Sequence, residues 1–129
     1  MTTVLVADDD SDLRTTVRDI LEAENYAVLE AQNGSEALHL LRSISPPLVV
    51  LLDLQMPQLG GAEVLRVVAA NKQLATRNHF ILMTAHARSL PLAIANLLFR
   101  LHILLLPKPF DVDQVVTLVA DAARMLPAR

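Results

Sequence analysis

The feature that most constrains this chain is a run of five apolar residues, 48–52, that ends at Asp53. Its valines and leucines are consecutive and do not alternate with polar residues, which is typical of a strand covered on both faces of a parallel sheet. Asp53 would then lie at the carboxyl end of the strand, the edge where open parallel sheets bind ligands. We therefore predict an α/β fold with Asp53 as a candidate site residue. The alternative is that Asp53 only caps a loop.

Extended and helical patterns alternate along the rest of the chain. Further strands are predicted at residues 3–7, 26–30, 80–83 and 103–106. Amphipathic helices are predicted to begin at Ser11 and near Ser89, with Pro91 in the first turn of the latter, and to cover residues 35–42, 62–71 and 112–125. Five strand–helix units predict one parallel sheet with helices on both faces.

Composition agrees with a single domain over residues 1–129. The chain has 129 residues, 53% of them hydrophobic, which is enough to bury a core. It has no cysteine, which excludes disulfides and thiolate metal sites. A net charge of −3 argues against a surface for nucleic acid or for anionic membranes. No signal peptide or membrane span is visible, so we expect a soluble cytoplasmic protein.

Chemically capable side chains follow four of the five predicted strands. They are Asp8, Asp9, Asp53, Thr84 and Lys108. Because the carboxyl ends of parallel strands share one edge of a sheet, these groups are predicted to converge. Carboxylate oxygens suit Mg²⁺ or Mn²⁺ better than zinc, and a lysine offsets part of the repulsion between the acids. The convergence also weighs against the loop-cap alternative for Asp53.

Five segments carry a resemblance to a known family. They are VLVADDD at residues 4–10, NGSEAL at 33–38, LLDLQMP at 51–57, MTA at 83–85 and PKPF at 107–110. In this order and spacing the chain resembles the receiver domains of two-component response regulators, such as the chemotaxis regulator. The resemblance implies a flavodoxin-like αβα sandwich of three layers, with strand order 2-1-3-4-5 and five helices.

The resemblance also implies a phosphoacceptor site. Asp53 would take a phosphoryl group from a histidine kinase or histidine phosphotransfer protein. Asp9, Asp53 and the backbone carbonyl of Gln55 would ligate Mg²⁺ or Mn²⁺, and Asp8 would act through a metal-bound water. Transfer and self-hydrolysis would make this a self-phosphorylating and self-dephosphorylating signalling domain and not a metabolic enzyme.

Other family positions are implied to assist this chemistry. Lys108 would pair with a phosphoryl oxygen, across a bond to Pro109 that is usually cis in the family. The Thr84 hydroxyl would bind another phosphoryl oxygen, and Ala85 is small enough for the backbone to approach the phosphate. Asp10 is expected to cap a helix and not to bind the metal.

Three residues are predicted to modulate the signal. Gln55 and His86 would set the lifetime of phospho-Asp53 by orienting water; alternatively, they are two solvated polar side chains. Leu105 stands where the family usually has a Tyr or Phe that turns inward on phosphorylation. This substitution makes a weakly switching, constitutive interaction module or a phosphate sink an alternative to a switching receiver.

Two partner surfaces are predicted. The helix that begins near Ser89 is apolar on a second face that includes Leu92 and Phe99. Together with the strand at 103–106 and the helix at 112–125, it predicts a surface for a homodimer or an effector. The alternative is an irregular helix that buries both faces in the monomer. For the kinase, the predicted surface comprises Leu13, Arg14, Val17 and the loop at residues 56–57.

Overall fold

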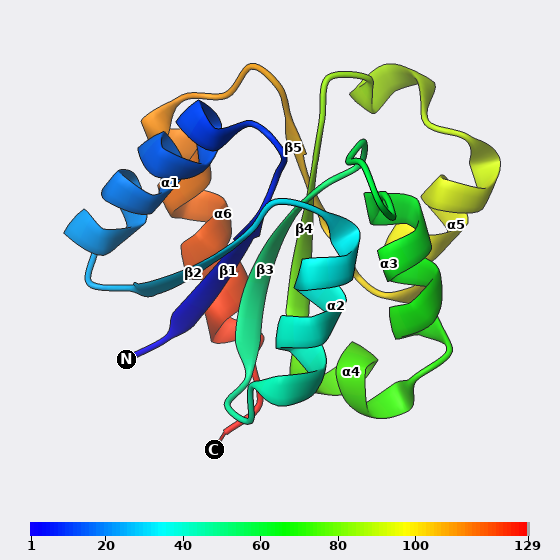
Figure 1. The fold of residues 1–129 in the computed structure, drawn as a ribbon, viewed down its shortest axis with the longest axis horizontal. Coiled ribbons are helices and arrows are strands. Elements are labelled where there is room, and N and C mark those ends of the chain that lie inside the picture. The colour runs from blue at the N-terminus through cyan, green and yellow to red at the C-terminus, as the bar shows by residue number, and fades with distance from the viewer. Residues whose placement is uncertain (129) are drawn as a thin grey trace.

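The computed structural model describes residues 1–128, which form a three-layer α/β sandwich (Figure 1). The five strands are β1 (Thr3–Ala7), β2 (Ala27–Ala31), β3 (Leu48–Asp53), β4 (His79–Thr84) and β5 (Leu104–Pro107). They form one parallel sheet in the order β2-β1-β3-β4-β5, which confirms the predicted topology.

Helices cover both faces of the sheet. They are α1 (Ser11–Ala23), α2 (Gly34–Ser43), α3 (Gly61–Ala69), α4 (Lys72–Arg77), α5 (Leu92–Arg100) and α6 (Val112–Arg124), with a 3₁₀ turn η1 at Ala87–Ser89. Figure 1 shows α1 and α6 on one face and α2, α3 and α5 on the other. Each face therefore has its own apolar core.

The central strand β3 explains why its sequence is apolar without alternation. All six of its residues are buried. Val49 and Leu51 pack into the core under α1 and α6, whereas Val50 and Leu52 pack into the core under α2, α3 and α5. Because neighbouring residues of a strand point to opposite faces, a strand with helices on both sides needs apolar residues throughout.

The predicted count of five helices is wrong, because a sixth, α4, lies between α3 and β4. The Asn71 side chain caps it by accepting a hydrogen bond from the backbone N–H of Leu74. Leu74 is the one residue of this six-residue helix that is buried. A helix with a single inward residue shows no apolar periodicity, so the sequence pattern could not reveal it.

The predicted start of α5 near Ser89 is also wrong. Residues 87–89 form η1, Leu90 is extended, and Pro91 precedes the helix as its N-cap instead of lying in its first turn. The reason is steric, since a residue that precedes proline is pushed from the helical to the extended region. The helix itself begins at Leu92.

The two ends of the sheet have different roles. Both ends of the described chain lie beside the starts of the strands, opposite the loops that follow the strand ends (Figure 1). Within residues 1–128, no helix has the length and apolar character needed to cross a membrane. The edge at the carboxyl ends of the strands is thus left to the loops that carry the predicted site residues.

Candidate functional site

A pocket of about 410 Å³ lies at the carboxyl edge of the sheet. Its lining residues are Asp8, Asp9, Asp10, Asp53, Leu54, Gln55, Thr84, Ala85, His86 and Lys108. These residues follow β1, β3, β4 and β5, so the parallel sheet brings together groups that are up to a hundred positions apart. Every predicted site residue except Leu105 lines this pocket.

Three carboxylates meet in the pocket. Asp8, Asp9 and Asp53 each offer an oxygen, and these oxygens all lie within 4.8 Å of one another. Asp8 and Asp53 are buried, whereas Asp9 is exposed at the pocket mouth. A cluster of carboxylate oxygens with one open side fits a hard divalent cation such as Mg²⁺ or Mn²⁺.

Lys108 bridges the two buried acids. Its Nζ lies 2.8 Å from Asp8 Oδ2 and 3.2 Å from Asp53 Oδ1. Burial alone would lower the pKa of Lys108, but its hydrogen bonds to these carboxylates and their charge raise the pKa above its usual value. The Lys108–Pro109 peptide bond is cis, as predicted. The contacts of Nζ with the two carboxylates place the positive charge of Lys108 in the pocket.

The surroundings of Asp53 destabilise its ionised form. Burial and the neighbouring Asp8 charge raise its pKa from 3.8 to about 6, and Asp9 adds to the rise, while Lys108 opposes it. Asp53 is thus a carboxylate whose ionised form is under-compensated by the protein alone. This deficit of positive charge is a second feature of the site that fits a divalent cation.

Thr84 and the two residues that follow it also line the pocket. Thr84 is 3% exposed, and its Oγ1 accepts a hydrogen bond of 3.0 Å from the backbone N–H of His86. Its carbonyl accepts a bond of 2.8 Å from the backbone N–H of Lys108, which ties the ends of β4 and β5 together. Ala85, His86 and Gln55 are exposed around the pocket mouth.

Asp10 and Leu105 lie outside the acidic cluster. The Asp10 side chain caps α1 by accepting hydrogen bonds from the backbone N–H groups of Asp12 and Leu13, as predicted. Leu105 is half-buried on β5, pairs with Leu82 of β4 and packs against the core. Leu105 does not line the pocket, but it lies on the strand that ends directly before Lys108.

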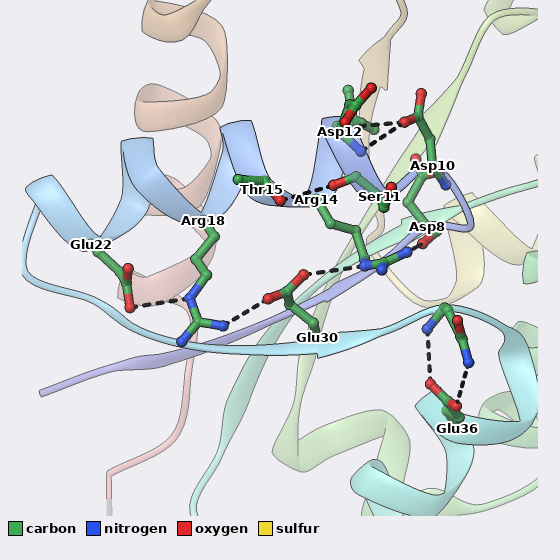
Figure 2. Close-up of polar contacts among 12 residues, drawn as sticks. Asp8, Asp10, Ser11, Asp12, Arg14, Thr15, Arg18, Glu22, Glu30 and Glu36 are labelled. Carbon is green, nitrogen blue, oxygen red and sulfur yellow. Dashed lines mark hydrogen bonds and ion pairs between the residues drawn. The ribbon is translucent and has the colours of Figure 1, made fainter.

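Two structural supports of the pocket were missed by the sequence analysis. The Arg14 side chain reaches from α1 to the backbone carbonyl of Asp8 (Figure 2). Gly34 donates a backbone hydrogen bond of 2.9 Å to Leu59 of the β3–α3 loop. Neither contact has a local signal in the sequence, although the Asn33-Gly34 pair marks where the second one begins.

The predicted kinase-facing surface on α1 is wrong for Val17. Val17 is fully buried and Leu13 packs against the same core, because both lie on the sheet-facing stripe of α1. Arg14 is engaged in internal hydrogen bonds. Leu13 is only partly buried, and it lines a groove between α1 and the start of α6 together with Asp12, Thr16 and Val112.

The predicted second apolar face of α5 is exposed. Leu92 is 77% and Phe99 is 85% accessible, while Ile94 and Leu97 point into the core. The alternative of a helix that buries both faces in the monomer is therefore wrong for these two side chains. The predicted exposure of large apolar residues on this face of α5 is thus present in the structure.

Comparison with known proteins places the chain in a family. The family model described as "Response regulator receiver domain" matches residues 4–120. The DNA-binding transcriptional regulator NtrC of Escherichia coli is 35% identical over 119 residues, which are 92% of this chain and 24% of that protein. The chain spans about a quarter of the length of the first curated relatives it matches.

Solved structures agree with this placement. The receiver domain of Francisella response regulator 1452 is 25% identical, with a TM-score of 0.81 over 96% of this chain and 98% of that one. The response regulator TrrA of Thermotoga maritima, solved in complex with Mg(2+)-BeF, is 27% identical, with a TM-score of 0.78 over 95% and 99% of the two chains. The chain described here belongs to the response regulator receiver domain family, whose members serve as phosphoacceptors in two-component signalling.

Proposed function

We propose that residues 1–129 form one receiver domain and that Asp53 is its phosphoacceptor. In the proposed reaction an Asp53 carboxylate oxygen attacks the phosphorus of a phosphohistidine. The new O–P bond forms as the P–N bond breaks, and the electron pair of the P–N bond returns to the imidazole nitrogen. The observation that carries this proposal is the convergence of three carboxylates and Lys108 in one pocket, with Asp53 at the end of the central strand.

The acidic cluster would hold the divalent cation. Asp9, Asp53 and the Gln55 backbone carbonyl are the proposed direct ligands for Mg²⁺ or Mn²⁺, with Asp8 acting through water. When bound, such a cation neutralises charge on the transferring phosphoryl group. The raised pKa of Asp53 supports this assignment, since the nucleophile must be ionised and the protein alone does not fully compensate its charge.

Lys108 and Thr84 would bind the transferred group. Lys108 already contacts Asp53, so its ammonium lies beside the position that a phosphoryl oxygen would take. Thr84 contributes a buried hydroxyl from the adjacent strand, and Ala85 leaves room beside it. Fixed donors of this kind stabilise developing charge without reorganisation.

Gln55 and His86 are proposed to set the lifetime of phospho-Asp53. Both side chains are exposed at the pocket mouth, where attacking water must enter. We expect Gln55→Ala and His86→Ala to change the rate of dephosphorylation, measured by loss of the phosphoprotein mass with time. Unchanged rates in both variants would contradict this role.

The partner that delivers phosphate is proposed to be a histidine kinase or a histidine phosphotransfer protein. The groove between α1 and α6 combines an apolar floor, which includes Ile20 and Phe110, with a rim that includes Asp12 and Asp111. This chemistry suits a partner helix with apolar residues flanked by basic ones.

The output surface is proposed to lie at the edge of the sheet where β5 runs between α5 and α6. Its exposed Leu92 and Phe99 support a homodimer or an effector contact, and nothing in the chain's charge supports nucleic acid as the partner of this domain. A second candidate function is a weakly switching interaction module or phosphate sink. Leu105 favours it, because an aliphatic residue there lacks an aromatic ring that could turn inward.

One experiment tests the proposed chemistry. The protein is incubated with Mg²⁺ and acetyl phosphate, and the intact mass is measured. We expect a gain of one phosphoryl group, which is absent in Asp53→Asn. No gain in the wild type, or an equal gain in Asp53→Asn, would overturn the assignment.

A second measurement separates the two candidate functions. Backbone amide spectra are recorded with beryllofluoride and Mg²⁺. Shifts that extend from the pocket to α5 and β5 support a switching receiver. Shifts confined to the pocket support the weakly switching alternative.

A further inference from the structure

The Arg14 side chain connects three parts of the molecule that surround the acidic cluster. It extends from the first turn of α1, and its Nε lies 3.1 Å from Glu30 Oε1 on the edge strand β2. Its Nη1 donates a hydrogen bond of 2.7 Å to the backbone carbonyl of Asp8. Figure 2 shows this guanidinium between the two acceptors. The side chain is only 16% exposed and does not line the pocket.

The Asp8 carbonyl belongs to the peptide bond that joins Asp8 to Asp9. Because a peptide unit is planar, a strong hydrogen bond to its oxygen restrains the whole plane, including the nitrogen of Asp9. The orientation of this plane in turn determines the direction in which the Asp9 side chain leaves the backbone. Arg14 can therefore act on Asp9 without touching it.

Asp9 has greater need of this restraint than Asp8 does. The Asp8 carboxylate is anchored at both oxygens, by the backbone N–H of Asp10 at 3.0 Å and by Lys108 Nζ at 2.8 Å. Within residues 1–128, by contrast, no hydrogen bond or ion pair holds the exposed Asp9 carboxylate. Its place beside Asp53 depends on its backbone and on its own rotamer, without help from a neighbouring side chain in the part of the chain that the structure describes.

Glu30 orients the guanidinium of Arg14. Its second oxygen accepts a hydrogen bond of 2.7 Å from Arg18 Nη1, and Arg18 Nε also contacts Glu22 at 3.3 Å (Figure 2). The bond from Arg18 is the main reason why the pKa of Glu30 is lowered, so Glu30 stays ionised as an acceptor. Arg18 itself is 42% exposed and makes no contact with Asp8.

We propose that Arg14 is a positioning residue of the cation site, which holds the Asp8–Asp9 peptide so that the Asp9 carboxylate faces Asp53. This inference rests on the proposed function, since it assumes that Asp9 is a metal ligand. Arg14 acts through the backbone, outside the ligand set. Removal of such outer partners typically weakens metal affinity by about 10–100-fold.

The test is Mn²⁺ binding to the unphosphorylated protein, followed by the electron paramagnetic resonance signal of free Mn²⁺. The variants are Arg14→Ala, Arg14→Lys and, as a matched control on the same Glu30, Arg18→Ala. We expect both Arg14 variants to raise the Kd about 10-fold, and Arg18→Ala to stay within about 2-fold of wild type because it leaves the bond to Asp8 in place. Arg14→Lys keeps the charge but loses the planar fork that serves two acceptors at once.

The outcomes separate positioning from electrostatics and from misfolding. A wild-type Kd in Arg14→Lys, or equal weakening in Arg14→Ala and Arg18→Ala, would mean that only positive charge matters and would overturn the inference. Unchanged Kd in both Arg14 variants would overturn it as well, while leaving the phosphoacceptor function intact. Absence of Mn²⁺ binding in the wild type would overturn both.

Folding is controlled by thermal denaturation of each variant and by the amide shifts of Asp9 and Asp10. The inference expects these shifts to move in Arg14→Lys and not in Arg18→Ala. If Arg14→Ala does not fold, Arg14→Lys and Glu30→Gln decide the question, and Glu30→Gln is expected to weaken Mn²⁺ binding less than Arg14→Lys. Unmoved Asp9 and Asp10 shifts in Arg14→Lys would contradict the positioning role.

Discussion

The pocket at the carboxyl edge of the sheet and the face formed by α5, β5 and α6 hold their side chains in different ways. In the pocket, buried charges are restrained by several contacts at once, as for Asp8 with two anchored oxygens and a bonded carbonyl. On the α5 face, Leu92 and Phe99 project into solvent. The proposed chemistry would therefore depend on a preorganised framework, whereas the proposed output surface would be completed by a bound partner.

The largest expected effect is on the framework itself. A methyl group at Gly34 would lie 2.2 Å from the Leu59 carbonyl oxygen, so Gly34→Ala must displace the β3–α3 loop. We expect a loss of about 1–3 kcal/mol in unfolding free energy by urea denaturation. Gly60→Ala in the same loop is the control and should cost less, because its methyl group would meet the flexible Glu63 carboxylate at 2.9 Å and a backbone oxygen, that of Leu54, only at 3.1 Å. Equal losses in the two variants would show that the loop is not docked through Gly34.

The next effect concerns pH and Asp53. The pKa of Asp53 is about 6 in the folded protein, whereas its ordinary value is 3.8. Ionisation of Asp53 therefore lowers the stability of the folded protein. Without divalent cation, the contribution of protonated Asp53 to stability is fully present below pH 3.8 and is lost as the pH rises from 3.8 to about 6, with about 1 kcal/mol of the loss above pH 5 and little change above pH 7. Denaturation in EDTA should show this loss in the wild type and not in Asp53→Asn. A parallel pH profile in the two proteins would contradict it.

A smaller effect of opposite sign is expected at the edge strand. The hydrogen bond from Arg18 and, less strongly, that from Arg14 lower the pKa of Glu30. Its stabilising contribution is present above the ordinary pKa of 4.5 and is lost as the pH falls through the lowered value. Because the pair is partly exposed, Glu30→Gln should cost below about 1 kcal/mol at pH 7, and the cost should shrink as the pH falls below 4.5, as measured by urea denaturation. A cost that grows in acid would overturn this prediction.

The smallest effect on stability is expected on the α5 face. Phe99 is 85% exposed, so Phe99→Asp should change the unfolding free energy by less than about 0.5 kcal/mol. It should also leave phosphorylation of Asp53 unchanged while abolishing self-association of the phosphorylated protein, measured by light scattering. A monomeric wild type, with or without beryllofluoride, would rule out self-association. Slower phosphorylation in Phe99→Asp would break the contrast between the two regions.

Much of this protein could be predicted from local sequence. The apolar run that ends in Asp53 specifies a doubly covered strand, because burial on both faces leaves no place for polar residues. The acids, the hydroxyl and the lysine at the strand ends follow from the same pattern, since a parallel sheet gathers its carboxyl ends at one edge. The cap at Asp10 was equally local.

The features that were predicted wrongly or left open have different causes. The short helix α4 has too few inward residues to show a helical period. Val17 was assigned to a partner surface although it lies on the apolar stripe by which α1 packs against the core. The exposure of Leu92 and Phe99 depends on how α5 packs on the sheet, which the sequence of the helix does not specify.

The sequence by itself thus determined the strands, the edge of the sheet that carries the candidate site and the side chains that gather there, because each is encoded by a strand and its end. The order of the strands was implied only by the resemblance to the receiver family. Only the tertiary structure decided how those side chains are held. Arg14 meets Glu30 across 16 positions, and Lys108 meets Asp8 across 100. Such contacts carry no local pattern, because hydrogen-bond geometry is set by the packing of whole elements and not by neighbours in the chain.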